Sequence, residues 1–202
     1  MLLILNGIYW VAQTVSNMTL VNGWRYRTAG ATPLTNFILN GFTASTNNLT
    51  GTTTDSRAVA KNPGDTTNST LALKTVEMGY DATWSDQAIG LGPYDNPGAG
   101  SIENAFYIYI PNDRQLIGNA GAGEFSLGFT LPASTTSKVR CRVVVDTVFW
   151  RVFFEYSTNS GGSWTILNSG GTLTTATIAT PLYAVFASFV VSVVLKDIKG
   201  DI

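Results

Sequence analysis

The sequence predicts an all-β fold in which two antiparallel sheets pack face to face as a β-sandwich. Short stretches of alternating apolar and polar residues follow one another along the chain, separated by clusters of Gly, Pro, Asn and Ser. No segment repeats its apolar residues every 3.6 positions between helix caps, as an amphipathic helix would. The 202 residues match the length of one large β-sandwich, so residues 1–202 are expected to form a single domain.

The N-terminal segment is expected to contribute strands to this domain or to its assembly. The apolar opening Met1–Leu5 has no basic residue before it and is followed by Asn6 and Gly7. It is therefore interpreted as a strand and turn, not as a signal peptide or a membrane span. A second strand is predicted over Met18–Arg27. Residues 1–30 thus form a possible N-terminal strand or assembly segment, packed on their own sandwich or on a neighbouring subunit.

Residues 31–70 are less regular. A short strand is predicted at Phe37–Leu39. The stretch Thr43–Thr70 is dominated by Thr, Asn, Ser and Gly, which favours a long surface excursion or short edge strands.

From residue 71 onward the strands become regular and are bounded by turn-forming residues. The predicted strands are Leu71–Met78, Gln87–Leu91, Ala105–Ile110, Glu124–Thr130, Lys138–Val145, Val148–Tyr156 and Thr165–Leu167. Alternation assigns one face of the strand that begins at Val148 to the core: Val148, Trp150, Val152, Phe154 and Tyr156. Cys141, the single cysteine, cannot form an internal disulfide and is expected to be a buried small apolar residue.

The last predicted strand, Tyr183–Lys196, is unusually long. At about 3.3 Å per residue it would extend roughly 46 Å if unbroken, so a bend or bulge is expected near Ser188, with Ser192 as a second candidate. Its apolar residues point to both sides. The strand is therefore central in a thick sandwich, or a neighbouring subunit covers it.

The segment Ser157–Trp164 joins two strands and is predicted to be a hairpin loop. It resembles the Asp-box pattern Ser-x-Asp-x-Gly-x-Thr-Trp, with Asn159 in the place of the aspartate and Ser163 in that of the threonine. Asn159 is suited to bond back to turn amides, Gly161 to supply a positive φ angle, and Trp164 to pack under the loop. The resemblance implies a structural hairpin, remote from any active site, formed by Ser157, Asn159, Gly161, Ser163 and Trp164.

Composition excludes several classes of function. Twelve basic and thirteen acidic residues give a net charge of -1 without a basic cluster, which is unlike a nucleic-acid-binding protein. Histidine is absent, so the commonest general base and transition-metal ligand are missing. Charged residues make up only 12% of the chain, and its polarity comes from Thr, Asn, Ser and Gly. This composition suits an extracellular or virion protein.

The loop region Tyr80–Ser101 mixes aromatic, amide and acidic residues, which could stack on and hydrogen-bond a sugar. The candidate ligand-binding residues are Trp84, Asp86, Tyr94, Asp95 and Asn96. Alternatively, Trp84 and Tyr94 merely cap the end of the sandwich. Asp95 and Asn96 are also possible calcium ligands, but the chain has no Asp-x-Asp-x-Asp-Gly loop, so no metal or other cofactor is predicted. Separately, Arg140, Arg142 and Arg151 form either a small basic strip or a solvated sheet face.

Three features from Leu71 onward carry a resemblance to a known family. They are the run Ala88–Gly92, the adjacent strands Val139–Val145 and Val148–Tyr156, and the ending Ala187–Ile198. Their order, over about two-thirds of the chain, resembles a concanavalin A-like domain of the laminin-G-like or SPRY-like kind. The resemblance implies a jelly roll whose loops or concave sheet bind glycans or protein ligands. Phages often use such domains in tail fibres, receptor-binding proteins and capsid decorations.

These observations together predict a non-enzymatic structural or attachment protein of a virion, such as a bacteriophage capsid decoration, fibre or tail component. It is expected on the virion surface or outside the cell. Its expected partners are copies of itself, other virion proteins or a cell-surface glycan, with no nucleic acid and no membrane span. The alternative is a secreted carbohydrate-binding, lectin-like module that binds through the Trp84–Asn96 region.

A third class, glycoside hydrolase, is less favoured. Concanavalin A-like relatives that hydrolyse glucans carry a strand reading Glu-x-Asp-x-x-Glu, whose paired carboxylates perform the chemistry. The glutamates of this chain are isolated and lack that spacing: Glu77, Glu103, Glu124 and Glu155. No catalytic residue is therefore predicted.

Overall fold

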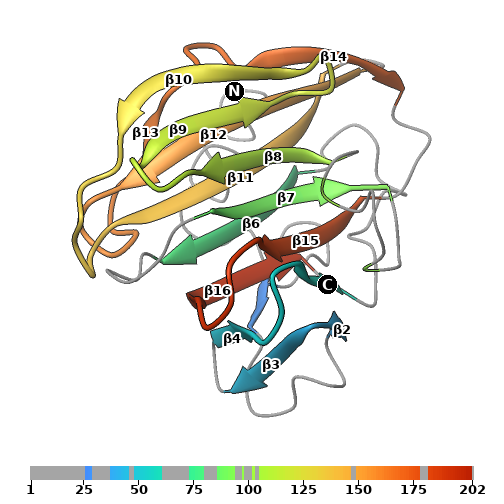
Figure 1. The fold of residues 1–202 in the computed structure, drawn as a ribbon. Helices are drawn as coiled ribbons and strands as arrows, with labels where there is room; N and C mark the ends of the chain where they lie inside the picture. Colours follow the sequence, from blue (N-terminus) through green and yellow to red (C-terminus); the bar gives the residue numbers. More distant parts are fainter. Residues whose placement is uncertain are drawn as a thin grey trace, which may run out of the picture.

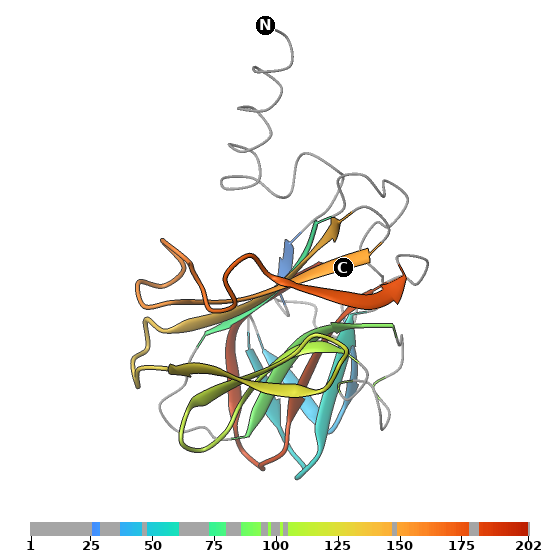
Figure 2. The same cartoon turned by 90° about the horizontal axis from the view of Figure 1, so that it is seen from above.

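A computed structural model shows two stacked antiparallel sheets (Figures 1 and 2). It describes residues 26–28, 37–45, 48–60, 73–79, 86–93, 97, 102, 105–146, 149–177 and 182–201. Every regular element in these ranges is a β-strand. The predicted all-β, two-sheet antiparallel fold is therefore confirmed. The described ranges also include no helix long and apolar enough to cross a bilayer.

The larger sheet has nine strands in the described part of the chain. Their order across the main path is β13 (Thr165–Ile166), β12 (Phe149–Ser157), β11 (Lys138–Asp146), β6 (Leu73–Gly79), β16 (Val194–Asp201), β4 (Asn48–Gly51) and β3 (Phe42–Ser45). Two further strands pair off this path, β1 (Tyr26–Thr28) with β16 and β14 (Thr172–Thr177) with β12. We call it the nine-stranded sheet.

The second sheet has seven strands, again counting described residues. Their order is β10 (Glu124–Thr130), β9 (Gln115–Asn119), β8 (Phe106–Ile110), β7 (Gln87–Gly92), β15 (Tyr183–Ser188), β5 (Ser56–Ala60) and β2 (Phe37–Asn40). We call it the seven-stranded sheet.

The main hydrophobic core lies between the two sheets. Because side chains alternate along a strand, every second residue of the central strands points inward. On β12 these residues are Trp150, Val152 and Phe154, each at most 1% exposed, as predicted, while Tyr156 is half-buried. Val148 lies outside the described residues. Cys141 is fully buried in the same core, also as predicted, and burial raises the pKa of its thiol.

A second, smaller apolar cluster lies on the opposite face of the seven-stranded sheet, which we call its outer face. Val59, Ala88, Tyr107, Val185 and Ala187 belong to it and are at most 8% exposed. Two residues between β7 and β8, Ile102 and Ala105, pack against them. The central strands of this sheet are therefore buried on both faces, which explains why β15 is apolar on both faces, the pattern expected of a central strand.

The structure corrects the predicted fourteen-residue C-terminal strand. The chain does break after Ser188, but it then crosses from β15 in one sheet to β16 in the other. Ser188 Oγ donates a hydrogen bond to the carbonyl of Val190 at 2.9 Å, and Ser192 has a φ of 66°. These contacts define a tight turn. It could not be recognised in the sequence, because the apolar residues of the segment continue on both faces.

Other differences concern the irregular and polar parts of the sequence. Within Thr43–Thr70 the described residues form short strands, but β5 lies between β15 and β2 rather than at an edge. Strands β9 and β14 were not predicted. The predicted strand at Met1–Leu5, and Met18–Arg27 apart from its last two residues, lie outside the described residues.

Candidate ligand-binding site

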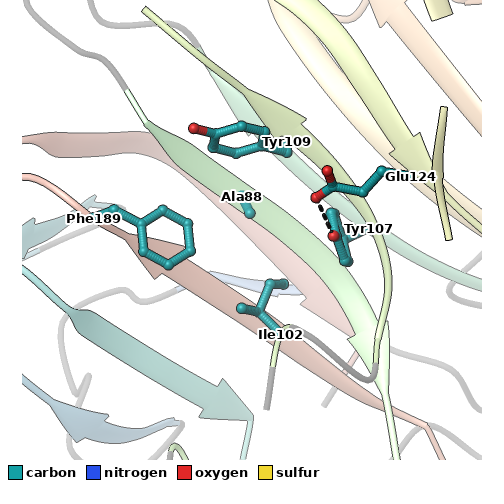
Figure 3. A pocket seen from close by; sticks show the side chains of 6 residues that line it. All are labelled: Ala88, Ile102, Tyr107, Tyr109, Glu124 and Phe189. Atoms are coloured by element: carbon teal, nitrogen blue, oxygen red, sulfur yellow. Dashed lines mark hydrogen bonds between the residues drawn. The ribbon is translucent and has the colours of Figure 1, made fainter. Parts of the chain in front are cut away.

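A cavity of about 330 Å³ opens on the outer face of the seven-stranded sheet (Figure 3). Among the described residues its lining side chains are Ala88, Ile102, Tyr107, Tyr109, Glu124 and Phe189. Figure 3 shows the small side chain of Ala88 in the middle of the five larger ones. The volume is at the lower end of the range of about 300 to 1,000 Å³ that is typical of small-molecule sites.

The strand register explains why the cavity lies here. Tyr107 and Tyr109 are two residues apart on β8, so both side chains point to the outer face. Tyr109 is paired with Ala88 on β7, and Tyr107 with Gly90. Small residues opposite two large aromatic ones leave open space above β7. Gly90 is required, because an added Cβ would lie 2.8 Å from the Cβ of Tyr107 and collide with the backbone of β8.

A carboxylate lies at the end of the cavity nearest Tyr107. The Tyr107 hydroxyl donates a hydrogen bond of 2.5 Å to Oε1 of Glu124, which is the first residue of β10 (Figure 3). Glu124 is exposed, and its second oxygen, Oε2, accepts no hydrogen bond from the described residues. This oxygen is therefore available to a ligand.

Tyr109 is held by a second carboxylate. Its hydroxyl donates to Oδ1 of Asp86 at 2.7 Å, and the side-chain amide of Asn112 donates to Oδ2 at 3.4 Å. Burial, followed by this hydrogen bond and the charges of Asp86, Glu124 and Asp113, raises the pKa of Tyr109 well above its usual range. The hydroxyl thus stays protonated at neutral pH and continues to donate to Asp86.

Phe189 completes the aromatic lining. Its ring contacts Tyr109 edge to face, with ring centroids 6.1 Å apart and an interplanar angle of 78°. The Arg57 guanidinium lies 5.8 Å from the Phe189 centroid, and its Nε is 2.9 Å from Oδ1 of Asp55. This arginine is therefore engaged by an acidic partner.

The sequence-predicted site residues coincide with this cavity only in part. Asp86 lies beside it and fixes the Tyr109 hydroxyl. Trp84, Tyr94, Asp95 and Asn96 lie outside the described residues, so their proposed role stays a prediction. The lining residues Tyr107, Tyr109, Glu124 and Phe189 were not among the sequence-predicted candidates. The sequence did contain a signal for this site. Two tyrosines alternate along β8, which places their aromatic rings on the face opposite to Phe106, Ile108 and Ile110.

The Asp-box-like hairpin lies elsewhere, between β12 and β13 of the nine-stranded sheet. Asn159 Oδ1 accepts a hydrogen bond from the Ser163 amide at 2.9 Å, and Ser157 Oγ accepts one from the Gly161 amide at 2.9 Å. Gly161 has a φ of 88°, a backbone conformation that favours glycine. The Trp164 ring lies close to Gly161. These contacts hold the turn together.

The three arginines considered as a basic strip are engaged by other groups of the same chain. On the outer face of the nine-stranded sheet, Arg140 Nε lies 2.5 Å from Oε2 of Glu155, and Arg142 Nη2 lies 3.0 Å from Oε1. Their guanidiniums also stack on aromatic rings, over Trp164 at 4.1 Å and over Phe153 at 4.2 Å. Arg151 donates to the carbonyl of Gly170 at 3.1 Å.

For Arg140 and Arg142, this arrangement corrects both sequence interpretations. The side chains of Arg140 and Arg142 are only 13% and 16% exposed, so they do not form a solvated face. They do not form a free basic strip either, because Glu155 offsets part of their charge. Within the described residues, no group of three or more acidic or cysteine side chains is placed to hold a metal ion.

Comparison with known proteins yields structural likenesses only. No protein-family model and no curated protein matches the chain. The exoplasmic/lumenal domain of VIP36, in a Ca²⁺/Man-bound form, is similar with a TM-score of 0.48, 9% identity and 81% coverage of each chain. The SPRY domain of human HERC1 gives a TM-score of 0.49, 12% identity and coverage of 81% of this chain and 94% of that domain.

A third similar structure is the winged bean acidic lectin in complex with methyl-alpha-D-galactose. Its TM-score is 0.42 at 10% identity, with coverage of 88% of this chain and 98% of the lectin. At such low identities the likeness concerns the fold alone.

Proposed function

We propose that this chain is a non-enzymatic carbohydrate-binding domain whose ligand occupies the cavity on the outer face of the seven-stranded sheet. One observation carries this proposal: three aromatic rings, from Tyr107, Tyr109 and Phe189, surround a cavity that also presents the Glu124 carboxylate. Sugar rings combine apolar C–H faces with hydroxyl groups, so they need both aromatic surface and hydrogen-bonding groups.

The proposal favours the lectin-like alternative from the sequence over the virion role. The volume and aromatic lining of the cavity suit a small ligand, whereas the expectation of a virion component rests on composition and on resemblance. A carbohydrate-binding domain of this kind is consistent with an extracellular location, since its ligands are displayed on cell surfaces and polysaccharides.

A glycan array with the purified chain tests the proposal. Substitution of Ala88→Leu fills the centre of the cavity without removing any polar group, and Leu173→Ala is the matched control. Leu173 is 49% exposed and lies on the nine-stranded sheet. We expect binding to at least one glycan, a loss of more than tenfold in affinity for Ala88→Leu, and no change for Leu173→Ala.

Two outcomes would overturn the proposal. One is the absence of binding to any glycan on the array. The other is unchanged binding by Ala88→Leu in a protein whose thermal unfolding shows that it is folded. Trp84→Ala, measured in parallel, tests whether the sequence-predicted loop also contributes to the site.

A further inference from the structure

The polar side chains among the described lining residues suit a ligand group that donates hydrogen bonds and accepts none. The hydroxyl protons of Tyr107 and Tyr109 are both directed at carboxylates, those of Glu124 and Asp86. The remaining described lining side chains are apolar: Ala88, Ile102 and Phe189. Among the described lining side chains, what is left for a ligand is therefore the lone pairs of Glu124 Oε2 and of the Tyr109 hydroxyl.

Among the described lining residues, the one charged side chain is a carboxylate. Glu124 lines the cavity directly, and Asp86 lies one hydrogen bond behind Tyr109. The charges of Asp86, Glu124 and Asp113 all contribute to the raised pKa of Tyr109, which shows that their fields overlap at this ring. Arg57, whose guanidinium lies 5.8 Å from the Phe189 ring centroid, is ion-paired with Asp55.

We infer that the preferred ligand is an amino sugar whose ammonium group binds between Glu124 and the aromatic rings of the cavity. This inference rests on the proposed carbohydrate-binding function. An ammonium group has three hydrogen-bond donors and no acceptor, so it complements the lone pairs of Glu124 and Tyr109. A neutral hydroxyl also has acceptor lone pairs, for which the described lining side chains leave no donor. The faces of Tyr107, Tyr109 and Phe189 add a cation–π attraction, and Glu124 adds an ion pair.

The test compares three disaccharides of the same β-1,4 linkage by isothermal titration calorimetry: glucosamine, N-acetylglucosamine and glucose. The pH is kept below the pKa of the ligand's amine. We expect the glucosamine disaccharide to bind at least tenfold more tightly than either neutral one. Glu124→Gln, which keeps the shape of the side chain but removes its charge, is expected to reduce this preference to less than threefold.

A matched control separates local from overall charge. Asp197→Asn also removes one negative charge, but Asp197 lies on β16 of the nine-stranded sheet, and its side chain is 56% exposed. Asparagine also tolerates its positive φ of 47°. Asp197→Asn is therefore expected to keep the full preference for the amine.

Three outcomes contradict the inference, and they remain distinct from failure of the proposed function. Equal or tighter binding of a neutral disaccharide, or an undiminished preference in Glu124→Gln, overturns the amino-sugar inference alone. So does binding of other glycans on the array with no binding of the glucosamine disaccharide. If no glycan of any kind binds, the proposed function itself fails.

Discussion

The outer faces of the two sheets use the same residue types in opposite ways. On the nine-stranded sheet, Glu155 is 3% exposed and is closed in by two arginines, each stacked on an aromatic ring. On the seven-stranded sheet, aromatic rings and carboxylates again lie side by side, but the described lining residues include no arginine or lysine, and a cavity remains. The comparison indicates that the first arrangement stabilises the fold and the second leaves room for a ligand.

The largest expected effect is on the nine-stranded sheet. Glu155→Ala would leave Arg140 and Arg142 largely buried without their common carboxylate. Breaking a buried charge network by removing one partner typically costs about 3 to 5 kcal/mol. We therefore expect a loss of about 3 kcal/mol in the free energy of unfolding, measured by urea denaturation. A loss below about 1 kcal/mol, the typical value for a surface salt bridge, would show that the network is not a stabilising element.

An intermediate effect on stability is expected at Tyr109, which both lines the cavity and forms a hydrogen bond within the fold. Tyr109→Phe removes the hydroxyl that donates to Asp86 and should cost about 1 kcal/mol of unfolding free energy, the usual net contribution of one hydrogen bond. Tyr183→Phe is the control on the same face, because its hydroxyl makes no hydrogen bond with the described residues. Equal stability changes in the two variants would contradict the assigned role of the Tyr109–Asp86 bond.

The smallest effect on stability is expected at Glu124. Its carboxylate is exposed and accepts one side-chain hydrogen bond from the described residues, so Glu124→Gln should change the free energy of unfolding by less than about 0.5 kcal/mol. The same variant is expected to show the largest change in ligand preference. A destabilisation as large as that of Glu155→Ala would remove the distinction between a structural and an open face.

The strands that could be predicted from the sequence are those whose alternation is strong. Strands β11 and β12 alternate valine and aromatic residues with arginine, and the structure pairs them from Lys138 with Ser157 to Asp146 with Phe149. Strand β9 could not be recognised, because Gly118 occupies a core position that the Phe154 ring fills: an added Cβ would lie 2.8 Å from it. Strand β14 is rich in threonine and gives no clear alternation.

The site was harder to predict than the fold, because its residues come together only through long-range pairing. Asp86 and Tyr109 are 23 positions apart, and Tyr107 and Glu124 are 17 positions apart. The pairing of β8 with β9, and of β9 with β10, brings Glu124 to Tyr107. No local sequence pattern predicts this contact. The role of the chain in a virion rests on composition and resemblance and stays a prediction.

The position of β16 has a consequence for how the chain folds. This strand pairs with β6 on one side and with β4 and β1 on the other, so it joins early and late segments within one sheet. Until β16 has been synthesised and has left the ribosome, the early strands β1 and β4 lack the partner that connects them to β6. The nine-stranded sheet therefore closes only after synthesis of residue 201, and its high contact order should make this step slow.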